Sequence, residues 1–319
     1  MVSSVSIAYW RSTCASGSGA DQRWAAPLPD VQVLRQYAMD TRETTLELRA
    51  GTADDAAALY FYRLALFRED AVSEAFAEVA QLAGFAAAAP TRAMVHAARP
   101  ALLFPATTWS LGSAATGFSW ANERGARVVA VPEFEIDAQA VSWAQYAEFV
   151  EDGGYDDARH WSAEGWAWVQ AQGRRTPRFV DQMRQGVLQQ RGGKLVRVPM
   201  GQPAVHITWF EADAWCRWAE RRLPSEVEWE AAAFQGASRG MRWGDVWEWT
   251  SNTFRLFEGN PTVAAKQPPY DDSCAGLGVA KVLRGASSCT RDRLRFAKVR
   301  RARAAAFDLG FCGFRSCAP

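Results

Sequence analysis

The first hundred residues show the hydrophobic pattern of two long helices. Residues 27–51 have a Pro-Asp start signal and a Gly stop signal, and these signals predict the first helix in this range. From about Asp54 to Gly84, apolar positions recur at alternating spacings of four and three, the period of one helix face. This second pattern predicts a helix that is buried over much of its surface, as in a bundle. The predicted stripe consists of Phe61, Ala65, Arg68, Val72, Ala75, Val79 and Leu82, widened by Leu59, Tyr62, Leu66 and Phe76.

Two helices are fewer than a four-helix bundle needs. We therefore expect either irregular structure in residues 1–27 or an incomplete bundle that the rest of the chain or a partner covers. Residues 85–100, FAAAAPTRAMVHAARP, predict a linker. Residues 1–100 are accordingly interpreted as a partial helical region with its linker, and residues 101–319 as a second domain.

Beyond residue 100 the pattern changes to short strand-like runs that alternate with turns and short helices. Two capping boxes mark helix starts, Thr208 with Glu211 and Ser225 with Glu228. The pattern predicts an α+β domain rich in irregular structure. The strand-like runs are ALLFPATTW, RVVAVPEFEID, PAVHITW and KVLRGAS.

Composition adds few constraints. The 319 residues are 49% hydrophobic and 22% charged with a net charge of +1, which gives no reason to expect nucleic acid as a partner. Fifteen tryptophans favour loops anchored by large side chains, or an aromatic-lined pocket. Six cysteines without a CxxC pair favour free thiols in a reducing cytoplasm. No apolar run reaches the length of about eighteen residues that a membrane span needs.

Several segments of the second half resemble one superfamily, in its expected order. They are AVHITWFEADAWCRWAERRLPSEVEWEAAA, WGDVWEWTSNTF, KVLRGASSCTRDRL and GFRSCA. Together they resemble the formylglycine-generating-enzyme (sulfatase-modifying factor) domain, a variant of the C-type-lectin fold. The resemblance covers roughly residues 101–319.

Other segments are similar to one branch, the ergothioneine sulfoxide synthases and the related selenoneine synthases. They are FEIDAQAVSWAQYAEFVEDGGY, HWSAEGWAW, DQRWAAPLPDVQVLRQY and LYFYRLALFREDAVSEAFAEVAQLAGF. In that family a DinB-type helical bundle precedes the lectin-like domain, and three His hold a non-heme Fe(II). The resemblance implies an oxidoreductase that uses O2 to join sulfur or selenium, from a thiol or selenosugar donor, to Nα-trimethylhistidine (hercynine).

The residues at the family's iron positions differ from this pattern. Two of the ligands come from a helix with the motif HxxxHxE, and the matching residues here are Arg68, Val72 and Glu74. A guanidinium has no lone pair to offer a metal, and a valine side chain has no donor atom. The third ligand lies upstream of the matching segment and is expected to be absent. The sequence therefore predicts a degenerate member that binds no iron and is inactive alone, although whether it is an enzyme stays open.

The three histidines are expected to be packing or hydrogen-bonding residues. His96 lies in the predicted linker, His160 in a loop and His206 in a predicted strand. Two interpretations of Arg68 stay open. Either the incomplete bundle lets Arg68 reach water, or Arg68 fills the old metal position and pairs with Glu74 or another carboxylate.

The motif WEWTSN supplies candidates for substrate binding. Trp247 and Trp249 are candidates for an aromatic wall that holds a trimethylammonium group by cation–π attraction. The competing interpretation makes these tryptophans part of the core. Polar candidates for a carboxylate or an amide of the substrate are Glu248, Asn252, Arg284 and Arg315.

The C-terminal segments depart from the family pattern. A GASS run replaces its GGSW-like turn, and a basic run replaces its aromatic, Asn-containing run. The basic run is expected to be a solvated face, with an anionic partner as the alternative. Cys312 and Cys317 leave a copper oxidase as an alternative, because thiolates are suitable copper ligands. The basic residues are Arg291, Arg293, Arg295, Lys298, Arg300, Arg301 and Arg303.

Three functions remain open at this stage. The first is a degenerate ergothioneine or selenoneine synthase that binds a small zwitterion or assists an intact paralogue. The second is a working oxidoreductase that takes metal ligands from elsewhere, or from an N-terminal segment lost through a wrong start or a frameshift. The third is an interaction module that uses the lectin-like fold without small-molecule chemistry.

Overall fold

The computed structural model describes residues 29–86, 94–114, 118–184, 186–261 and 273–319. Residues 1–28, which include Cys14 and most of the DQRWAAPLPD segment, lie outside the described residues, as do residues 87–93 of the predicted linker. Contacts group the chain into two compact units, residues 1–59 and 60–319. The predicted domain division at residue 100 stays a prediction.

The first unit contains helix α3, Val31–Ala50. The Asp30 carboxylate caps it by accepting a hydrogen bond from the Gln32 amide at 2.8 Å, and Gly51 follows its last turn. The predicted start and stop of this helix are confirmed. No residue of α3, all of which is described, is buried.

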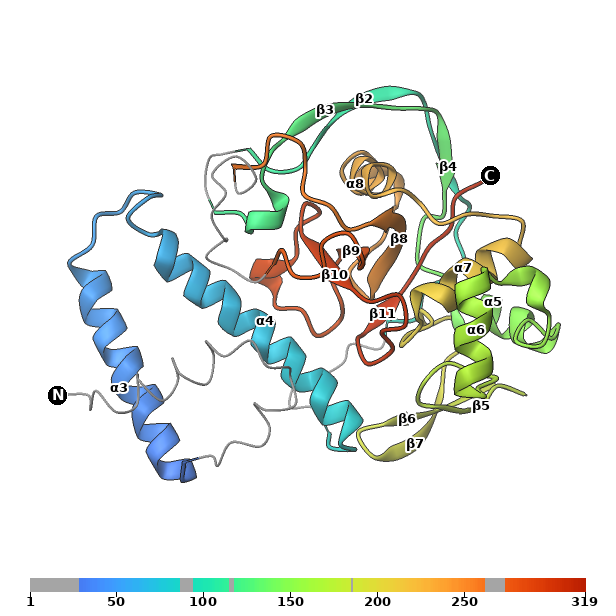
Figure 1. The fold of residues 1–319 in the computed structure, drawn as a ribbon, viewed down its shortest axis with the longest axis horizontal. Coiled ribbons are helices and arrows are strands. Elements are labelled where there is room, and N and C mark those ends of the chain that lie inside the picture. The colour runs from blue at the N-terminus through green and yellow to red at the C-terminus, as the bar shows by residue number, and fades with distance from the viewer. Residues whose placement is uncertain (1–28, 87–93, 115–117, 185, 262–272) are drawn as a thin grey trace. The chain divides into compact units, whose positions relative to one another are not determined.

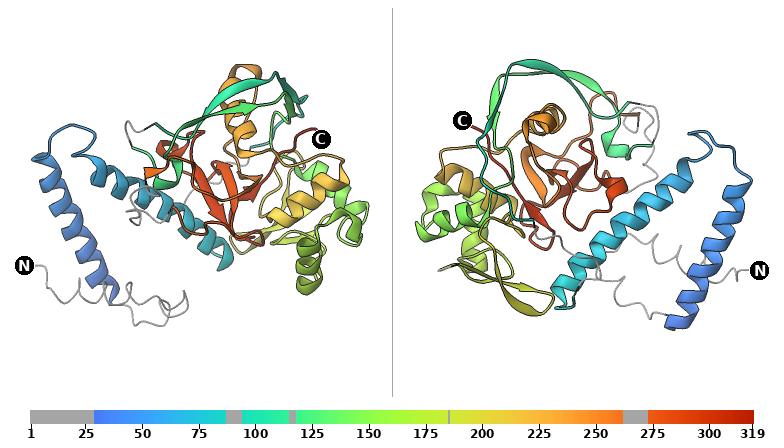
Figure 2. Two further views of the ribbon diagram at one scale, coloured as in Figure 1. Left: turned by 45° about the horizontal axis from the view of Figure 1, so that its top comes forward. Right: turned by 180° about the vertical axis from the view of Figure 1, so that it is seen from behind.

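Helix α4, Tyr60–Leu82, belongs to the second unit and lies beside its C-terminal strands (Figures 1 and 2). Its buried residues are Leu64, Asp70, Glu74 and Ala77. Leu64 packs in a small cluster with Trp120 and Leu294. Two of the four buried positions are carboxylates, so the buried face of α4 is unusually polar.

The stripe predicted to be buried on this helix is wrong. Phe61 is 57% exposed, Phe76 69% and Val79 48%. The opposite face also repeats at helical spacing, through Leu64, Phe67, Ala71 and Glu74, and the domain covers that face because it offers partners for the carboxylates. The more apolar face of α4 is consequently exposed.

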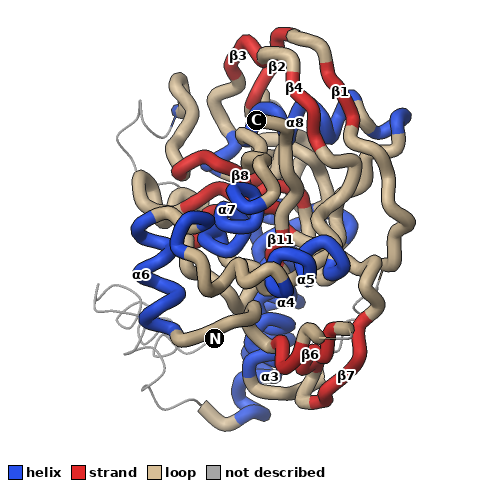
Figure 3. Tube along the Cα trace, turned by 90° about the vertical axis from the view of Figure 1, so that its right-hand side faces the viewer, coloured by secondary structure: helices blue, strands red, loops and turns tan. Residues whose placement is uncertain are grey.

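The second unit is an α+β structure of short strands, short helices and long loops (Figure 3). Strands β1 (Leu102–Phe104) and β4 (Phe134–Ile136) form one antiparallel pair, and β2 (Thr107–Leu111) and β3 (Arg127–Val131) form another. A three-stranded antiparallel sheet contains β5 (Val180–Gln182), β6 (Val187–Arg191) and β7 (Lys194–Val198).

The sheet that positions the site has four strands in the order β10-β9-β8-β11. Strands β8, β9 and β10 are antiparallel neighbours, whereas the C-terminal β11 runs parallel to β8. In this register Trp247 lies opposite Gly285, and Arg301 lies opposite Leu283 on the other side of β9. The strands are β8 (Trp247–Thr253), β9 (Lys281–Gly285), β10 (Arg300–Arg303) and β11 (Cys312–Gly313).

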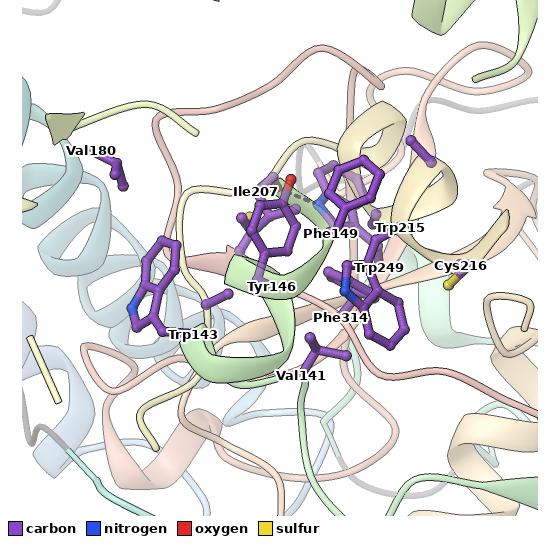
Figure 4. Close-up of a cluster of buried hydrophobic side chains, with 14 of the residues drawn as sticks. Val141, Trp143, Tyr146, Phe149, Val180, Ile207, Trp215, Cys216, Trp249 and Phe314 are labelled. Atoms are coloured by element: carbon purple, nitrogen blue, oxygen red, sulfur yellow. Dashed lines mark hydrogen bonds between the residues drawn. The ribbon is translucent and has the colours of Figure 1, made fainter. Parts of the chain in front are cut away.

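Both predicted capping boxes are present at the starts of α7 and α8. In each, the hydroxyl accepts from the amide three residues later while the Glu carboxylate accepts from the cap amide. Tryptophans anchor the core between helices and sheet: Trp143 and Trp249 are fully buried and pack with Tyr146, Phe149 and Phe314 (Figure 4). The four helices are α5 (Trp143–Glu151), α6 (Ala163–Gln172), α7 (Trp209–Trp218) and α8 (Glu226–Gln235).

Three predicted strand runs form strands, and the fourth does not. PAVHITW, residues 203–209, is a loop that leads into α7, and the backbone of His206 has φ 63°, outside the extended region. The prediction that His206 lies in a strand is therefore wrong. Among the described residues, no helix has both the length and the apolar character of a membrane span.

Because α4 buries its less apolar face, one substitution on each face tests this orientation. Leu64→Ala is expected to lower the free energy of unfolding by about 2–5 kcal/mol, because it leaves a cavity against Trp120 and Leu294. Phe76→Ala is expected to change it by only about 0.5 kcal/mol, because this larger side chain is exposed. Urea unfolding followed by tryptophan fluorescence measures both. An equal loss from Phe76→Ala would mean that the exposed face is covered in solution.

Candidate functional site

Glu74 lies at the centre of a buried polar cluster that joins α4 to three distant segments. Its Oε1 accepts hydrogen bonds from Trp247 Nε1 at 2.8 Å, from Thr290 Oγ1 at 2.9 Å and from Ser287 Oγ. Its Oε2 lies 2.6 Å from the guanidinium of Arg301. Glu74 is only 1% exposed, so these four groups replace the water that a carboxylate needs.

The sheet and the turn after β9 bring these partners together. Trp247 begins β8 and Arg301 lies in β10, with β9 between them. The turn that follows β9 holds Ser287 and Thr290, and Thr290 Oγ1 accepts a hydrogen bond from the Ser287 amide at 2.9 Å. This hydrogen bond holds the turn through contacts of its own, in addition to those with Glu74.

The cluster keeps Glu74 ionised. Burial alone raises the pKa of the Glu74 carboxyl, but the Arg301 charge and the hydrogen bonds from Ser287, Trp247 and Thr290 outweigh it and hold the pKa below its ordinary value. The Arg301 guanidinium also lies over the Trp247 ring, 4.2 Å from its centroid. Trp247 thus donates to the carboxylate while its ring face meets the paired cation.

Two further contacts hold α4 on the domain. The Asp70 carboxylate pairs with Arg293 at 2.7 Å. Near the end of the helix, the Gln81 side chain donates to the Gln190 carbonyl at 2.6 Å and accepts from the Gly192 amide at 3.0 Å. Polar contacts therefore run along the buried face of α4 from Asp70 to Gln81.

A cavity of about 310 Å³ lies between α4 and the sheet. This volume is at the lower end of the range for small-molecule sites, about 300–1,000 Å³. One wall is α4 and the other comes mainly from β8, β10 and the loop before β10. The lining residues are Arg68, Ala71, Val72, Ala75, Glu78, Trp120, Asn122, Trp247, Ser273, Ala275, Leu294, Val299, Arg300, Arg301, Ala302 and Arg303.

Residues 88–243 match the family model of the sulfatase-modifying factor enzyme 1-like domain. This part of the chain is similar to that domain. The α+β fold class and the resemblance to this superfamily are confirmed.

Similar curated proteins include two kinds of enzyme. The hercynine oxygenase of Mycolicibacterium smegmatis is 33% identical over 210 residues, which cover 52% of this chain and 48% of that protein. The formylglycine-generating enzyme of Streptomyces coelicolor is 31% identical over 140 residues, 28% of this chain and 43% of that protein. The chain spans about half the length of the first of these relatives. Among solved structures, PvdO from Pseudomonas aeruginosa aligns with a TM-score of 0.43 and 16% identity, over 68% of this chain and 93% of that one.

The two residues that the resemblance places at metal positions line the cavity between α4 and the sheet. Arg68 and Val72 are one turn apart on α4 and both belong to the lining. Neither offers a donor atom to Fe(II), and Glu74 already binds four protein groups. The residues present at these positions therefore do not fit an iron ion. Within the described ranges, no group of three or more His, Cys, Asp or Glu side chains is arranged to hold a metal.

Glu74, the carboxylate expected to pair with Arg68, has a different partner. Glu74 pairs with Arg301 of β10, and Arg68 is exposed. The interpretation in which Arg68 pairs with Glu74 is thus replaced by an Arg301–Glu74 pair. Arg68 lines the cavity, and its assignment to the old metal position stays a prediction.

Of the six residues predicted to bind substrate, Trp247 lines the cavity and the other five are absent from its lining. Glu248 and Arg315 form a buried ion pair, with the Arg315 Nε 2.5 Å from Oε2. Arg284 is fully buried and pairs with Glu230. Trp249 donates from Nε1 to the Ile207 carbonyl at 2.7 Å, and the Asn252 Oδ1 accepts from the Glu226 amide at 2.7 Å.

The remaining candidates have structural partners. His96 Nε2 lies 2.7 Å from Asp245, which fixes the described end of the linker, and His160 lies 3.7 Å from Asp157. Burial lowers the pKa of His206 to about 4, so its ring is neutral at pH 7. Burial also raises the pKa values of the Cys312 and Cys317 thiols, and protonated thiols are poor copper ligands.

Sequence reasoning missed most of the residues around Glu74. Ser287 and Thr290 lie in the KVLRGASSCTRDRL segment that carries the family resemblance, and Arg301 lies in the basic run, but none of the three was a site candidate. Asn122 was not considered, although it lines the cavity and is 1% exposed. One signal was available: Asp70 and Glu74 are spaced by four on the face that also carries Leu64 and Phe67, so that face has its own helical period.

The Glu74 cluster predicts that replacement of this carboxylate by an amide strongly lowers the stability of the fold. Glu74→Gln is expected to lower the free energy of unfolding by about 3–5 kcal/mol, because it leaves the Arg301 guanidinium beside an uncharged partner in a buried site. Glu69→Gln, on the exposed face of the same helix, is the matched control and is expected to be nearly neutral. Urea unfolding measures both, and equal stability of the two variants would show that the buried ion pair does not hold α4.

Glu123, next to the lining residue Asn122, predicts a dependence of stability on pH. Burial raises its pKa to about 8, although the charges of Arg284 and Arg300 oppose the shift. The folded chain therefore keeps a proton that the unfolded chain, with a pKa near 4.5, releases. The resulting stability is fully present below pH 4.5 and is lost as the pH rises toward 8.

Glu123→Gln removes this titration. The slope of stability against pH between 5 and 8 is expected to become less negative by up to about 1.4 kcal/mol per pH unit, with no further change above pH 8. Glu133→Gln, at an exposed position, is the control. Urea midpoints across this pH range test the expectation, and parallel curves for Glu123→Gln and wild type would contradict it.

Proposed function

We propose that this chain is a relative of the hercynine oxygenases that binds a small zwitterion of the hercynine type without iron at the α4 positions. The observation that carries the proposal is the shared lining of one cavity by Arg68 and Val72 of α4 and by Trp247 of β8. The resemblance places two of these at metal positions and the third in the substrate region. This shared lining supports the proposal of a ligand site in which two of the residues are unable to bind a metal.

The cavity suits a molecule of this size and character. It offers apolar surface from Ala71, Val72, Leu294 and Val299 for a flat ring. Guanidinium groups on both walls supply partners for a carboxylate. The thiol or selenosugar donor of the family would be a second ligand, and the choice between sulfur and selenium remains open.

A second candidate is an interaction module that assists an intact paralogue. The exposed apolar face of α4 favours it, because Phe61, Leu66, Phe76, Val79 and Leu82 are each at least 45% exposed. In that case the cavity need not bind hercynine. Binding measurements therefore separate the two candidates.

The test combines metal analysis, binding and turnover on the purified full chain. We expect far less than one iron per chain after expression with added iron, binding of hercynine by calorimetry, and no oxygen consumption with hercynine plus a thiol or selenosugar. Stoichiometric iron with turnover would overturn the iron-free assignment. Absence of hercynine binding would favour the interaction module.

A pair of variants locates the binding. Val72→Trp places a large ring at the cavity wall and is expected to weaken hercynine binding by about tenfold or more, which corresponds to 1.4 kcal/mol. Val79→Trp, two helical turns along the same face and outside the lining, is the control and is expected to bind as wild type does. Equal affinity of the two variants would place the ligand elsewhere.

A further inference from the structure

Glu78 of α4 carries the one carboxyl group among the described lining residues of the cavity. It lies one helical turn beyond Glu74, toward the end of α4. Its Oε1 lies 3.2 Å from the position that a Cβ on Gly310 would take, so the carboxyl reaches across to the loop before β11. Because glycine has no side chain, the Glu78 carboxyl has room beside that loop.

The protein leaves this carboxyl without a hydrogen bond. Arg303 and Arg301 of β10 and Glu74 of α4 act on it through their charges, and no described residue donates a hydrogen bond to it. The other titratable groups near it are the thiols of Cys289 and Cys312, whose pKa values burial raises. Burial also raises the pKa of the carboxyl itself, although the two guanidinium groups oppose the shift. A carboxyl that is short of both water and donors is suited to accept a hydrogen bond from a ligand in the cavity.

Small side chains lie beside Glu78 on both walls of the cavity. On α4, Ala75 and Ala71 lie three and seven positions before Glu78, on the same face of the helix, and both line the cavity. Ala302 of β10 lines the cavity from the sheet. These alanines leave space for a flat ring next to the carboxyl.

Only one group of a hercynine-type zwitterion offers a hydrogen atom to this carboxyl. The quaternary ammonium has no N–H, and the carboxylate has no proton at neutral pH, whereas the imidazole ring has an N–H donor. The charges of Arg301 and Arg303 also repel a further cation beside Glu78. Both arguments favour a neutral ring over an ammonium group as the partner of Glu78.

We infer that Glu78 selects the ring of the ligand by accepting a hydrogen bond from a neutral imidazole N–H. The inference rests on the proposed function for the choice of ligand. It goes beyond that proposal because it names the residue and the group that this residue recognises. A ligand of similar size and charge without a ring N–H would bind more weakly, since the carboxyl would lose water without gaining a donor.

Two betaines isolate the ring N–H. Hercynine has this group, whereas the betaine of 3-(2-thienyl)alanine keeps the trimethylammonium, the carboxylate and a five-membered ring without an N–H. Calorimetry at about pH 8, above the ordinary imidazole pKa of about 6.5, keeps the ring neutral. The wild-type chain is expected to bind hercynine at least about tenfold more tightly than the thienyl betaine, a difference of 1.4 kcal/mol.

A matched pair of variants assigns this preference to Glu78. Glu78→Met keeps the length of the side chain without its oxygens, and is expected to bind the two betaines within about twofold of each other. Glu69→Met, on the same helix and outside the lining, is the control and is expected to keep the wild-type ratio. The ratio cancels any effect on the ammonium and the carboxylate, because both ligands carry them. Near-ultraviolet circular dichroism confirms that each variant is folded.

Two outcomes would overturn the inference and leave the proposed function standing. The first is equal binding of the two betaines to the wild-type chain, a comparison that needs no variant. The second is a preference for hercynine that persists in Glu78→Met, because another group would then recognise the ring. In both cases hercynine binding would still support the proposed function.

Failure of the proposed function has a different signature. If neither betaine binds, ligand-observed NMR with imidazole alone tests the carboxyl. Binding of imidazole that is lost in Glu78→Met and kept in Glu69→Met would support recognition of the ring by Glu78 without the proposed function. Absence of imidazole binding to the wild-type chain would overturn both.

Discussion

The buried carboxylate of Glu74 is the constraint on which the rest of the site depends. An ionised carboxylate that leaves water loses several kcal/mol of solvation and remains charged only where donors and a cation replace the solvent. Trp247, Ser287, Thr290 and Arg301 supply these groups from β8, from the turn after β9 and from β10. Because all four must be in place together, the position of α4 and the geometry of the sheet edge determine each other.

This constraint also explains the inverted burial of α4. A helix normally buries its more apolar face, and the pattern of Phe61, Val72 and Val79 predicted that orientation. The opposite face carries Glu74, whose removal from water is compensated only by the partners on the domain. Docking through that face satisfies the carboxylate and leaves the apolar stripe exposed. The polar partners of Glu74 thus determine which face of α4 packs on the domain, and the hydrophobic period alone predicts the wrong face.

Features that depend on residues close together in the sequence were predicted correctly, whereas contacts between distant residues were missed. The start of α3 at Asp30 and the two capping boxes depend on residues within one helical turn, and all were predictable. The strands β1 to β4 and β9 followed from local runs of apolar and β-branched residues. The partners of Glu74 lie about 170 to 230 positions away in sequence, and no local period relates them. The substrate candidates shared this difficulty: Arg284, Glu248 and Arg315 carry charges typical of a site, yet they neutralise one another or a neighbouring Glu inside the core.

Arg68 and Val72 change what the cavity is able to do under the proposed function. A metal ion supplies both positive charge and open coordination positions, whereas a guanidinium supplies positive charge and hydrogen-bond donors alone. Replacement of a metal ligand by Arg68 therefore preserves attraction for an anion and removes the means of binding oxygen at that position. The second substitution, Val72, adds apolar surface beside it. A cavity with these two residues keeps the requirements of ligand binding and loses those of metal chemistry, which is why binding and turnover are expected to separate in this chain.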